Sequence, residues 1–547
     1  MPRYRFLISI ILTVVTFVFA LSFYWRPLVK NDYADDKFSA QKVAGDIKII
    51  SLEPHSIEHP QERKKVRDYL AKRLDDMEIS ASYYNYDSII SRLNTIIQIS
   101  NIYAKVDPLS GDAPSYLLLT AHMDSRFRKR VIDKYVYSYG AADDGYGMGV
   151  ILESVRLALR FRENWKQGIK ILFTDSEESD LDGIRNALEK NPEIFDKVGF
   201  VINIEARGVK GPALLFETSS GNENIIELYK SAEYPFTYSL TTAVYNILPN
   251  STDFTLLKNS YPGMNFSVID NLKFYHTDLD NYSNISMNSV QHYGEQITPI
   301  INKYLTDKTY SDRRSLYSEN DSIFLTMPLA GLVIFSKNLY LMINIFTLVL
   351  LCVVTWLLIK KKKIRKQGVL KYSVLILLYS VIASLTGFCI AFISAVLTKQ
   401  RYSIVNLPYV EYDWVIITVS LTALILFFGK VYLNKIQKSR FNPAESIIGN
   451  AIVQILISIF LYLSFGENFF VLLPALLALF ALLLSVLTHS RYLYIIAYVL
   501  ILLLLVPFYY AIIVALTIGS LPIYMILATL LISLLMPLMD SFVRKLV

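Results

Sequence analysis

The 547-residue sequence contains only two cysteines, and its 21 glycines and 19 prolines are too few to dominate the composition. These scarcities exclude a disulfide scaffold, a collagen-like chain and a low-complexity disordered chain. Charged residues are also scarce at 18%, whereas a soluble protein carries about 25%. Hydrophobic residues make up 53% of the chain, so part of it is expected to lie in an apolar environment.

The apolar residues are concentrated, and the first concentration lies at the N-terminus. An apolar run covers Phe6–Trp25, after the basic residues Arg3 and Arg5. It is long enough to cross a bilayer core of about 30 Å as a helix. A cleaved signal peptide is the competing interpretation, but no small-residue cleavage site is evident after Ala20. We therefore predict that residues 1–27 form an uncleaved membrane anchor.

Further apolar runs follow one another from residue 338 to the C-terminus. We predict that residues 338–547 form a membrane domain of about seven helices. The expected spans are Leu339–Ile359, Tyr372–Leu397, Val415–Leu433, Ile447–Phe465, Phe469–Thr488, Tyr492–Leu516 and Leu521–Met539. Both cysteines, Cys352 and Cys389, fall within these spans. Most of the spans contain no acidic or basic residue, which argues against a coupled transporter.

Basic residues in alternate loops predict the orientation of the chain in the membrane. They are Lys360–Lys363, Arg365, Lys366, Lys430, Lys435, Lys438, Arg440, Arg491, Arg544 and Lys545. Because positive residues mark the cytoplasmic side, we expect both termini inside and residues 28–337 outside. Much of the net charge of +7 is therefore assigned to topology, and it is no evidence for a nucleic-acid partner.

Residues 28–337 have the composition of a globular α/β domain, with dense charge and short apolar runs. The predicted strands are Tyr116–Met123, Ile169–Thr174, Val201–Ile204, Leu214–Phe216 and Met264–Val268, and the predicted helices are Gly145–Phe161, Arg185–Lys190, Ile225–Ala232 and Ser289–Tyr304. Strands that alternate with helices indicate a mostly parallel mixed sheet with helices on both faces. In such sheets, ligands bind beyond the carboxyl ends of the strands.

Imidazole and carboxylate side chains gather after the predicted strands. They are His122, Asp124, Asp143, Asp144, Glu177, Glu178, Glu205, His276 and Asp278. Two imidazoles and several carboxylates at one edge form a donor set suited to zinc or a similar divalent ion. Without a cation, acids packed so closely would stay partly protonated. Each motif alone is commonplace on a solvated loop, so the predicted metal site rests on their order and placement together.

Five motifs in this order resemble one known family. They are HMD, GAADDGYG, DSEESDLDG, NIEARG and YHTDLDN. The series resembles the di-zinc aminopeptidases of metallopeptidase family 28 over roughly Ile49–Leu305, and it implies the zinc exopeptidase fold. An anchor, an outward peptidase domain and a multi-span C-terminal region look like the vacuolar membrane protease and endoplasmic-reticulum metallopeptidase group. Glu53–Leu74 is similar to that group's opening PH motif and helix.

The resemblance implies a metal-binding role for five residues and two zinc ions per chain. Asp143 matches the bridging carboxylate, His122 and Glu205 would complete one zinc site, and Glu178 and His276 the other. Glu205 departs from the secreted relatives, which usually have Asp there. The longer side chain can still reach a metal.

The resemblance also implies roles in catalysis. Glu177 matches the general base, and Asp124 would hydrogen-bond the imidazole of His122. Tyr275 is a candidate donor to the oxyanion, with a packing role as the alternative. The Asp143–Asp144 peptide bond is expected to be cis.

A membrane-anchored zinc exopeptidase, most simply an aminopeptidase acting on extracytoplasmic peptides, is the function that these residues favour. A carboxypeptidase or dipeptidase is the alternative, because Arg207 could bind a substrate carboxylate, although a structural ion pair is the commoner role. A non-catalytic receptor of the same fold stays open, and a single-zinc glutaminyl cyclase reaction is disfavoured by the complete ligand set. Reading the N-x-S/T sequons as chance matches favours a bacterial plasma membrane, with a vacuolar or endoplasmic-reticulum membrane as the alternative.

Overall fold

The structure, a computed structural model, describes residues 3–24, 36–246, 250–437 and 441–543. The chain divides into two compact units, a globular unit Trp25–Lys337 and a helical unit formed by Met1–Tyr24 with Asn338–Val547. The domain boundary predicted after residue 27 and the loop cations Lys438, Arg440, Arg544 and Lys545 lie outside the described residues.

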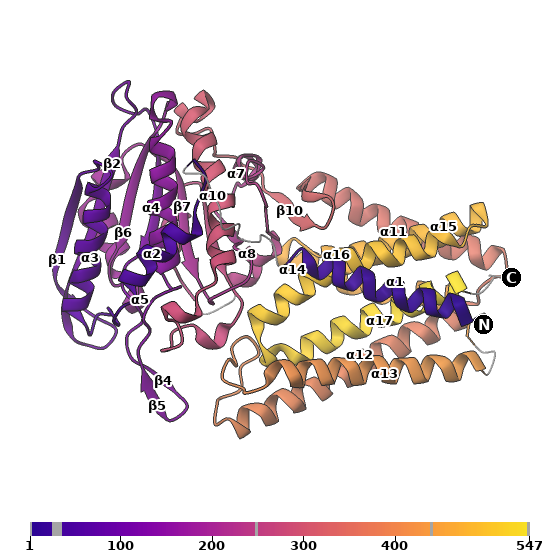
Figure 1. Ribbon diagram of the computed structural model, residues 1–547. Helices are drawn as coiled ribbons and strands as arrows, with labels where there is room; N and C mark the ends of the chain where they lie inside the picture. The colour runs from indigo at the N-terminus through magenta and orange to yellow at the C-terminus, as the bar shows by residue number, and fades with distance from the viewer. Residues whose placement is uncertain (1–2, 25–35, 247–249, 438–440, 544–547) are drawn as a thin grey trace. The chain divides into compact units, whose positions relative to one another are not determined.

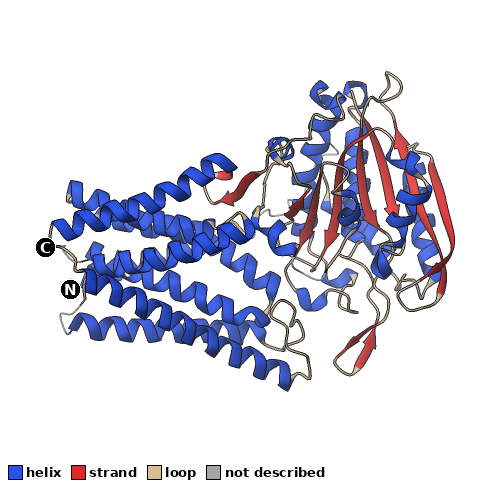
Figure 2. Ribbon diagram, turned by 180° about the vertical axis from the view of Figure 1, so that it is seen from behind, coloured by secondary structure: helices blue, strands red, loops and turns tan. Residues whose placement is uncertain are grey.

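A seven-stranded sheet forms the centre of the globular unit (Figure 2). Its order is β1-β2-β6-β3-β7-β9-β8, with bounds Ala81–Ile90, Ile96–Val106, Gly168–Thr174, Tyr116–His122, Val198–Ala206, Gly263–Val268 and Leu214–Thr218. The central strands β6, β3, β7 and β9 run parallel, and β2 and β8 run antiparallel to their neighbours. The predicted mixed α/β sheet is confirmed, and each predicted strand is present. The sequence did not predict β1 and β2.

Helices pack on the sheet (Figure 1). Alternate residues of β3 show that both faces are covered, and by which helices. Leu117 and Leu119 belong to a core shared with α2 (Ala40–Ile50), α4 (Gly145–Leu159) and α10 (Met287–Thr306). Leu118 points the other way, into a core shared with α6 (Asp182–Lys190) and α9 (Asp253–Leu257). Because both faces are covered, β3 is buried along its whole length, as is typical of parallel strands.

The remaining elements of the globular unit are short helices and two hairpins. They are α3 (Pro60–Asp75), α5 (Glu177–Asp180), α7 (Glu223–Tyr229), α8 (Leu240–Tyr245), β4–β5 (Lys129–Val131 and Lys134–Val136) and β10–β11 (Ser322–Met327 and Gly331–Ser336).

The helical unit contains the apolar runs of the sequence. Its helices are α1 (Arg3–Ser22), α11 (Lys337–Lys360), α12 (Lys366–Leu397), α13 (Asp413–Gln437), α14 (Pro443–Phe465), α15 (Phe469–Thr488), α16 (Tyr492–Leu516) and α17 (Leu521–Val543). Among the described residues, seven helices after residue 336 are long and apolar enough to cross a membrane, which confirms the predicted number. α1 packs against α16, and its described apolar stretch, Ile10–Ser22, is shorter. The chain is thus a multi-pass membrane protein.

A buried ion pair in the globular unit links α3 to the segment after β6. Arg63 Nη1 on α3 lies 3.1 Å from Asp175 Oδ1, and the two side chains are 4% and 0% exposed. The other carboxylate oxygen of Asp175 accepts the backbone N–H of Ser100 at 2.8 Å. Asp175 is followed two residues later by Glu177, so the pair fixes the start of the loop that carries the acidic pair.

We expect Arg63→Ala to destabilise the globular unit by about 3–5 kcal/mol, because it leaves the buried Asp175 carboxylate without its closest cation. The neighbouring variant Lys64→Ala is the control. It removes an exposed pair with Asp68, with side chains 63% and 53% exposed, and should cost less than about 1 kcal/mol. Thermal unfolding of the detergent-solubilised full chain should show a lower Tm for Arg63→Ala. Equal Tm values for the two variants would contradict this role of the pair.

Candidate metal centre

The carboxyl ends of the parallel strands bring together side chains from distant parts of the sequence. His122 is the last residue of β3, Glu205 lies next to the end of β7, and Glu178 lies in α5 just after β6. Asp143 precedes α4, and His276 follows β9. Because the strands are buried along their length, polar side chains are placed at their ends, where the sheet's edge opens.

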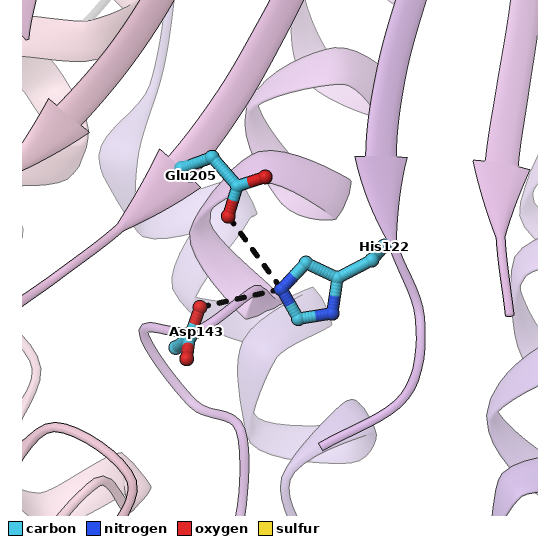
Figure 3. Close-up of side chains that lie close together, drawn as sticks. All are labelled: His122, Asp143 and Glu205. Carbon is cyan, nitrogen blue, oxygen red and sulfur yellow. Dashed lines mark hydrogen bonds and ion pairs between the residues drawn. The ribbon is translucent and has the colours of Figure 1, made fainter. Parts of the chain in front are cut away.

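One group of potential ligands centres on His122 (Figure 3). Its Nε2 atom lies 3.3 Å from Asp143 Oδ1 and 3.7 Å from Glu205 Oε2. Both carboxylates point at the same ring nitrogen, and all three residues are buried. Three ligand atoms that converge from three segments in this way could hold one metal ion.

A second group shares Asp143 with the first. His276 Nε2 lies 3.2 Å from Asp143 Oδ2 and 2.8 Å from Glu178 Oε1. The two oxygens of one carboxylate therefore face two different imidazoles, and each imidazole has a glutamate of its own. This geometry suits a pair of metal ions bridged by Asp143.

The donor atoms fit a cation better than they fit one another. Within the described part of the chain, His276 Nε2 and Glu178 Oε1 are fully buried and make no hydrogen bond of normal geometry, although they lie 2.8 Å apart. Burial and the charge of Asp143 raise the pKa of Glu205 to about 8, despite the opposing effect of His122. A divalent ion would satisfy the orphaned atoms and stabilise the charged carboxylate, and nitrogen with oxygen donors suits zinc.

Asp124 supports the site in a way that the sequence predicted only in part. Nδ1 of His122 lies 2.8 Å from the backbone carbonyl oxygen of Asp124 and 3.6 Å from its carboxylate. The carboxylate accepts the backbone N–H groups of Glu177 at 2.9 Å and Glu178 at 3.3 Å. One residue thus orients the imidazole through its main chain and the acidic pair through its side chain.

Asp144 joins the end of β3 to the start of α4. Its carboxylate accepts the backbone N–H of Gly147, as the N-cap of α4, and that of His122. A Cβ at residue 147 would lie 2.3 Å from Asp144 Oδ2, so a larger residue there would displace the capping carboxylate. The Asp143–Asp144 peptide bond is cis, as the resemblance implied. Asp144 therefore positions its neighbours and is not one of the grouped ligands.

Asp280 holds the Asp143 loop, and the sequence did not single it out. Its carboxylate accepts the backbone N–H groups of Ala142 at 2.7 Å and Asp143 at 3.3 Å, and the hydroxyl of Ser138 at 3.1 Å. Burial, and next the charge of Asp143, raises the pKa of Asp280 to about 7. The available signal was its place in the YHTDLDN motif. Asp278 in the same motif is exposed.

Cations also lie close to the second group of ligands. Arg126 Nη1 donates to the backbone carbonyl oxygen of Glu178 at 2.7 Å and to its Oε2 at 3.0 Å, a contact that the sequence did not predict. Lys129 on β4 lies with its Nζ 5.8 Å from the centroid of the Tyr275 ring. Burial lowers the pKa of Lys129 to about 8.

The two predicted catalytic side chains lie among the same carboxylates. Glu177 is the first residue of α5 and is 9% exposed. Burial and the charges of Glu205 and Glu178 raise its pKa well above the usual range, although His122 opposes the shift. The ring of Tyr275 stacks on that of His276, with centroids 3.6 Å apart.

Comparison with known proteins finds peptidases that are similar to the globular unit. Residues 101–301 match the sequence model of Peptidase family M28. Endoplasmic reticulum metallopeptidase 1 of Mus musculus is 29% identical over 231 residues, which are 41% of this chain and 24% of that protein. Vacuolar membrane protease of Candida dubliniensis is 24% identical over 356 residues, 62% of this chain and 36% of that protein. The chain thus matches about a quarter to a third of the length of these curated relatives.

Solved structures similar to this chain cover about half of it. A Zn-dependent exopeptidase from Parabacteroides distasonis is 20% identical, covers 49% of this chain and 98% of its own, and has a TM-score of 0.40. A glutaminyl cyclase from Porphyromonas gingivalis is 19% identical, covers 49% and 99%, and has a TM-score of 0.39.

The family match covers the residues from which the buried ligand groups come, from His122 to His276. One of these relatives is named as a membrane protease, in agreement with the apolar helices of the second unit. The chain therefore carries, over residues 101–301, a domain of peptidase family M28.

Proposed function

We propose that the globular unit is a two-zinc metallopeptidase, most simply an aminopeptidase that acts on peptides outside the cytoplasm. The observation that carries the proposal is the placement of Asp143, whose two carboxylate oxygens face His122 at 3.3 Å and His276 at 3.2 Å. Glu205 completes the ligands of one ion and Glu178 those of the other. The family of the domain and the relatives named as metallopeptidases support the reaction class.

The chain's own residues divide the chemistry between them. Zinc ions held by these ligands supply Lewis-acid activation of water and of the peptide carbonyl. The Glu177 carboxylate takes a proton from the attacking water and returns it to the leaving amine. The Tyr275 hydroxyl donates to the oxyanion, and Asp124 keeps the His122 ring and the Glu177 backbone in register.

A carboxypeptidase or dipeptidase is the second candidate, and the cations beside the ligands favour it. Arg126 donates to Glu178, and Lys129 lies over the ring of Tyr275, so a substrate carboxylate could pair with Lys129. The sequence proposed Arg207 as the residue that binds a substrate carboxylate. Arg207 is buried, and this burial lowers its pKa. A non-catalytic scaffold is the third possibility, which the complete set of ligands and the presence of Glu177 oppose.

We also propose the orientation of the chain. Six basic residues from Lys360 to Lys366 lie at or just beyond the end of α11, which supports a cytoplasmic location for this end of the helix. The globular unit would then face the other side of the membrane. A bacterial plasma membrane is the proposed compartment, and a vacuolar or endoplasmic-reticulum membrane is the alternative that the names of the relatives support.

Glu177→Gln should retain zinc and lose peptidase activity by about 10²- to 10⁴-fold, because it removes the general base without removing a ligand. The assay uses the purified full chain with matched peptides that have a free or an acetylated N-terminus. An aminopeptidase cleaves only the free form. Glu189→Gln makes the same change at an exposed residue of α6 and should retain full activity. Unchanged turnover in Glu177→Gln would contradict its assignment as the general base. Cleavage of acetylated peptides only would contradict the aminopeptidase assignment.

The zinc content should be two ions per chain, and His276→Ala should reduce it to about one. The first ligand group, which includes His122, does not use His276 and stays complete in that variant. His59→Ala is the control, since His59 belongs to neither group and instead contacts Ser56 at 2.9 Å. Elemental analysis after dialysis measures the ratio. One zinc in the unchanged protein would favour the single-metal arrangement of a cyclase instead.

Asp280→Ala should weaken zinc binding by about 10- to 100-fold, because the backbone that presents Asp143 loses its hydrogen bonds. Competition with a fluorescent chelator gives the affinity. Asp278→Ala removes an exposed acid two residues away and should leave the affinity unchanged. If the two variants bind zinc equally well, Asp280 does not position the bridging carboxylate.

A further inference from the structure

The helical unit contains a cavity of about 680 Å³ where five helices begin or end. Its lining includes Lys362 and Lys363 after α11, Pro443 at the start of α14, His489 after α15 and Tyr492 at the start of α16. Asp540 in the last turns of α17 also lines it. Because spans of this length end near the membrane surface, the cavity lies at the depth of lipid headgroups. Its volume is in the range of small-molecule sites.

Positive charge dominates the lining. Lys362, Lys363 and Arg491 contribute three cations, against the one carboxylate of Asp540. In the described part of the chain, none of these three cations forms an ion pair with a carboxylate. The amide of Asn442, which also lines the cavity, donates to the backbone carbonyl oxygen of Lys363 at 2.9 Å and so ties this segment to the start of α14. A built cluster of cations without acidic partners is suited to an anionic ligand.

The lining of the cavity changes from exposed and charged at one end to buried and mostly apolar at the other. The lysines are exposed, whereas Leu358, Leu482 and Tyr494 are buried, with exposed fractions of 1%, 1% and 0%. The Tyr494 hydroxyl is hydrogen-bonded to Ser485, a further lining residue, at 2.5 Å. α16 begins at the cavity, with Arg491 as its N-cap residue, so the positive end of the helix dipole lies at the same place. A ligand with an anionic head and an apolar body matches this gradient.

We propose that this cavity binds a phosphate group, and that its source is the headgroup of an anionic phospholipid, with Lys362, Lys363 and Arg491 as the cationic partners. Basic pockets between membrane helices are a known way to hold such headgroups. A free phosphate anion would bind the same cations but would not fill the buried apolar part of the cavity at Leu358 and Leu482. The inference does not depend on the peptidase function of the globular unit.

The test measures the Tm of the purified full chain in a non-ionic detergent as dioleoyl phosphatidylglycerol, dioleoyl phosphatidylcholine or inorganic phosphate is added. We expect a saturable rise in Tm with phosphatidylglycerol, little change with phosphatidylcholine, and a weaker response to inorganic phosphate. An equal and saturable response to inorganic phosphate would support the phosphate site but assign it to a soluble anion. Equal responses to the two lipids would overturn the proposal.

Matched charge variants locate the effect. Lys363→Gln combined with Arg491→Gln removes two lining cations and should weaken the apparent affinity for phosphatidylglycerol by at least about tenfold. Lys361→Gln combined with Lys366→Gln removes two nearby cations that do not line the cavity, and should keep the affinity. If the first pair fails to fold, the single exposed variant Lys362→Gln and native mass spectrometry of the lipid retained by the unchanged chain replace it. Equal affinities in lining and control variants, or equal retention of the two lipids, would overturn the proposal.

Discussion

Buried carboxylates at one edge of the sheet are the constraint on which the globular unit depends. Each must be compensated, because an uncompensated buried charge costs far more than one domain's stability allows. Asp124, Asp144 and Asp280 are compensated by backbone N–H groups, and Asp175 also by Arg63. Those four shape the loops in which the ligands stand. The proposed ligand carboxylates instead face the imidazoles of His122 and His276, and Glu178 also accepts from Arg126. The proposed metal ions would supply the remaining compensation.

The sequence predicted the centre of this arrangement and missed its periphery. Residues at strand ends could be found because hydrophobic runs mark the strands and the parallel topology brings their ends together. Asp280 and Arg126 could not be found in this way, since their partners are set by how loops approach in three dimensions. β1 was missed for a different reason. The exposed edge strand β1 mixes polar and aromatic residues and lacks the continuous apolar run of β3.

The helical unit was easier to predict, because backbone groups in a bilayer must bond within their own segment and spans are therefore long apolar helices. Seven predicted spans correspond to α11–α17. Hydropathy carries no information about polar contacts inside the unit. Asn450 donates to Ser533 Oγ at 2.6 Å and accepts from Gln454 at 2.7 Å, linking α14 to α17. Such contacts depend on the rotation of each helix, which an almost uniformly apolar sequence leaves unspecified.

The chain has a net charge of +7, and its basic residues have different surroundings in the two units. In the globular unit, some cations pair with buried acids, as in Arg63 with Asp175 and Lys258 with Glu217 at 2.6 Å. Such pairs fix loops and leave no charge to attract a ligand. In the helical unit many of the cations lie near the helix ends, and sidedness alone would require only that they lie on the correct side of the membrane. Three of them line one cavity with a single carboxylate, which is more order than sidedness requires. This arrangement supports the proposal that Lys362, Lys363 and Arg491 meet a lipid headgroup.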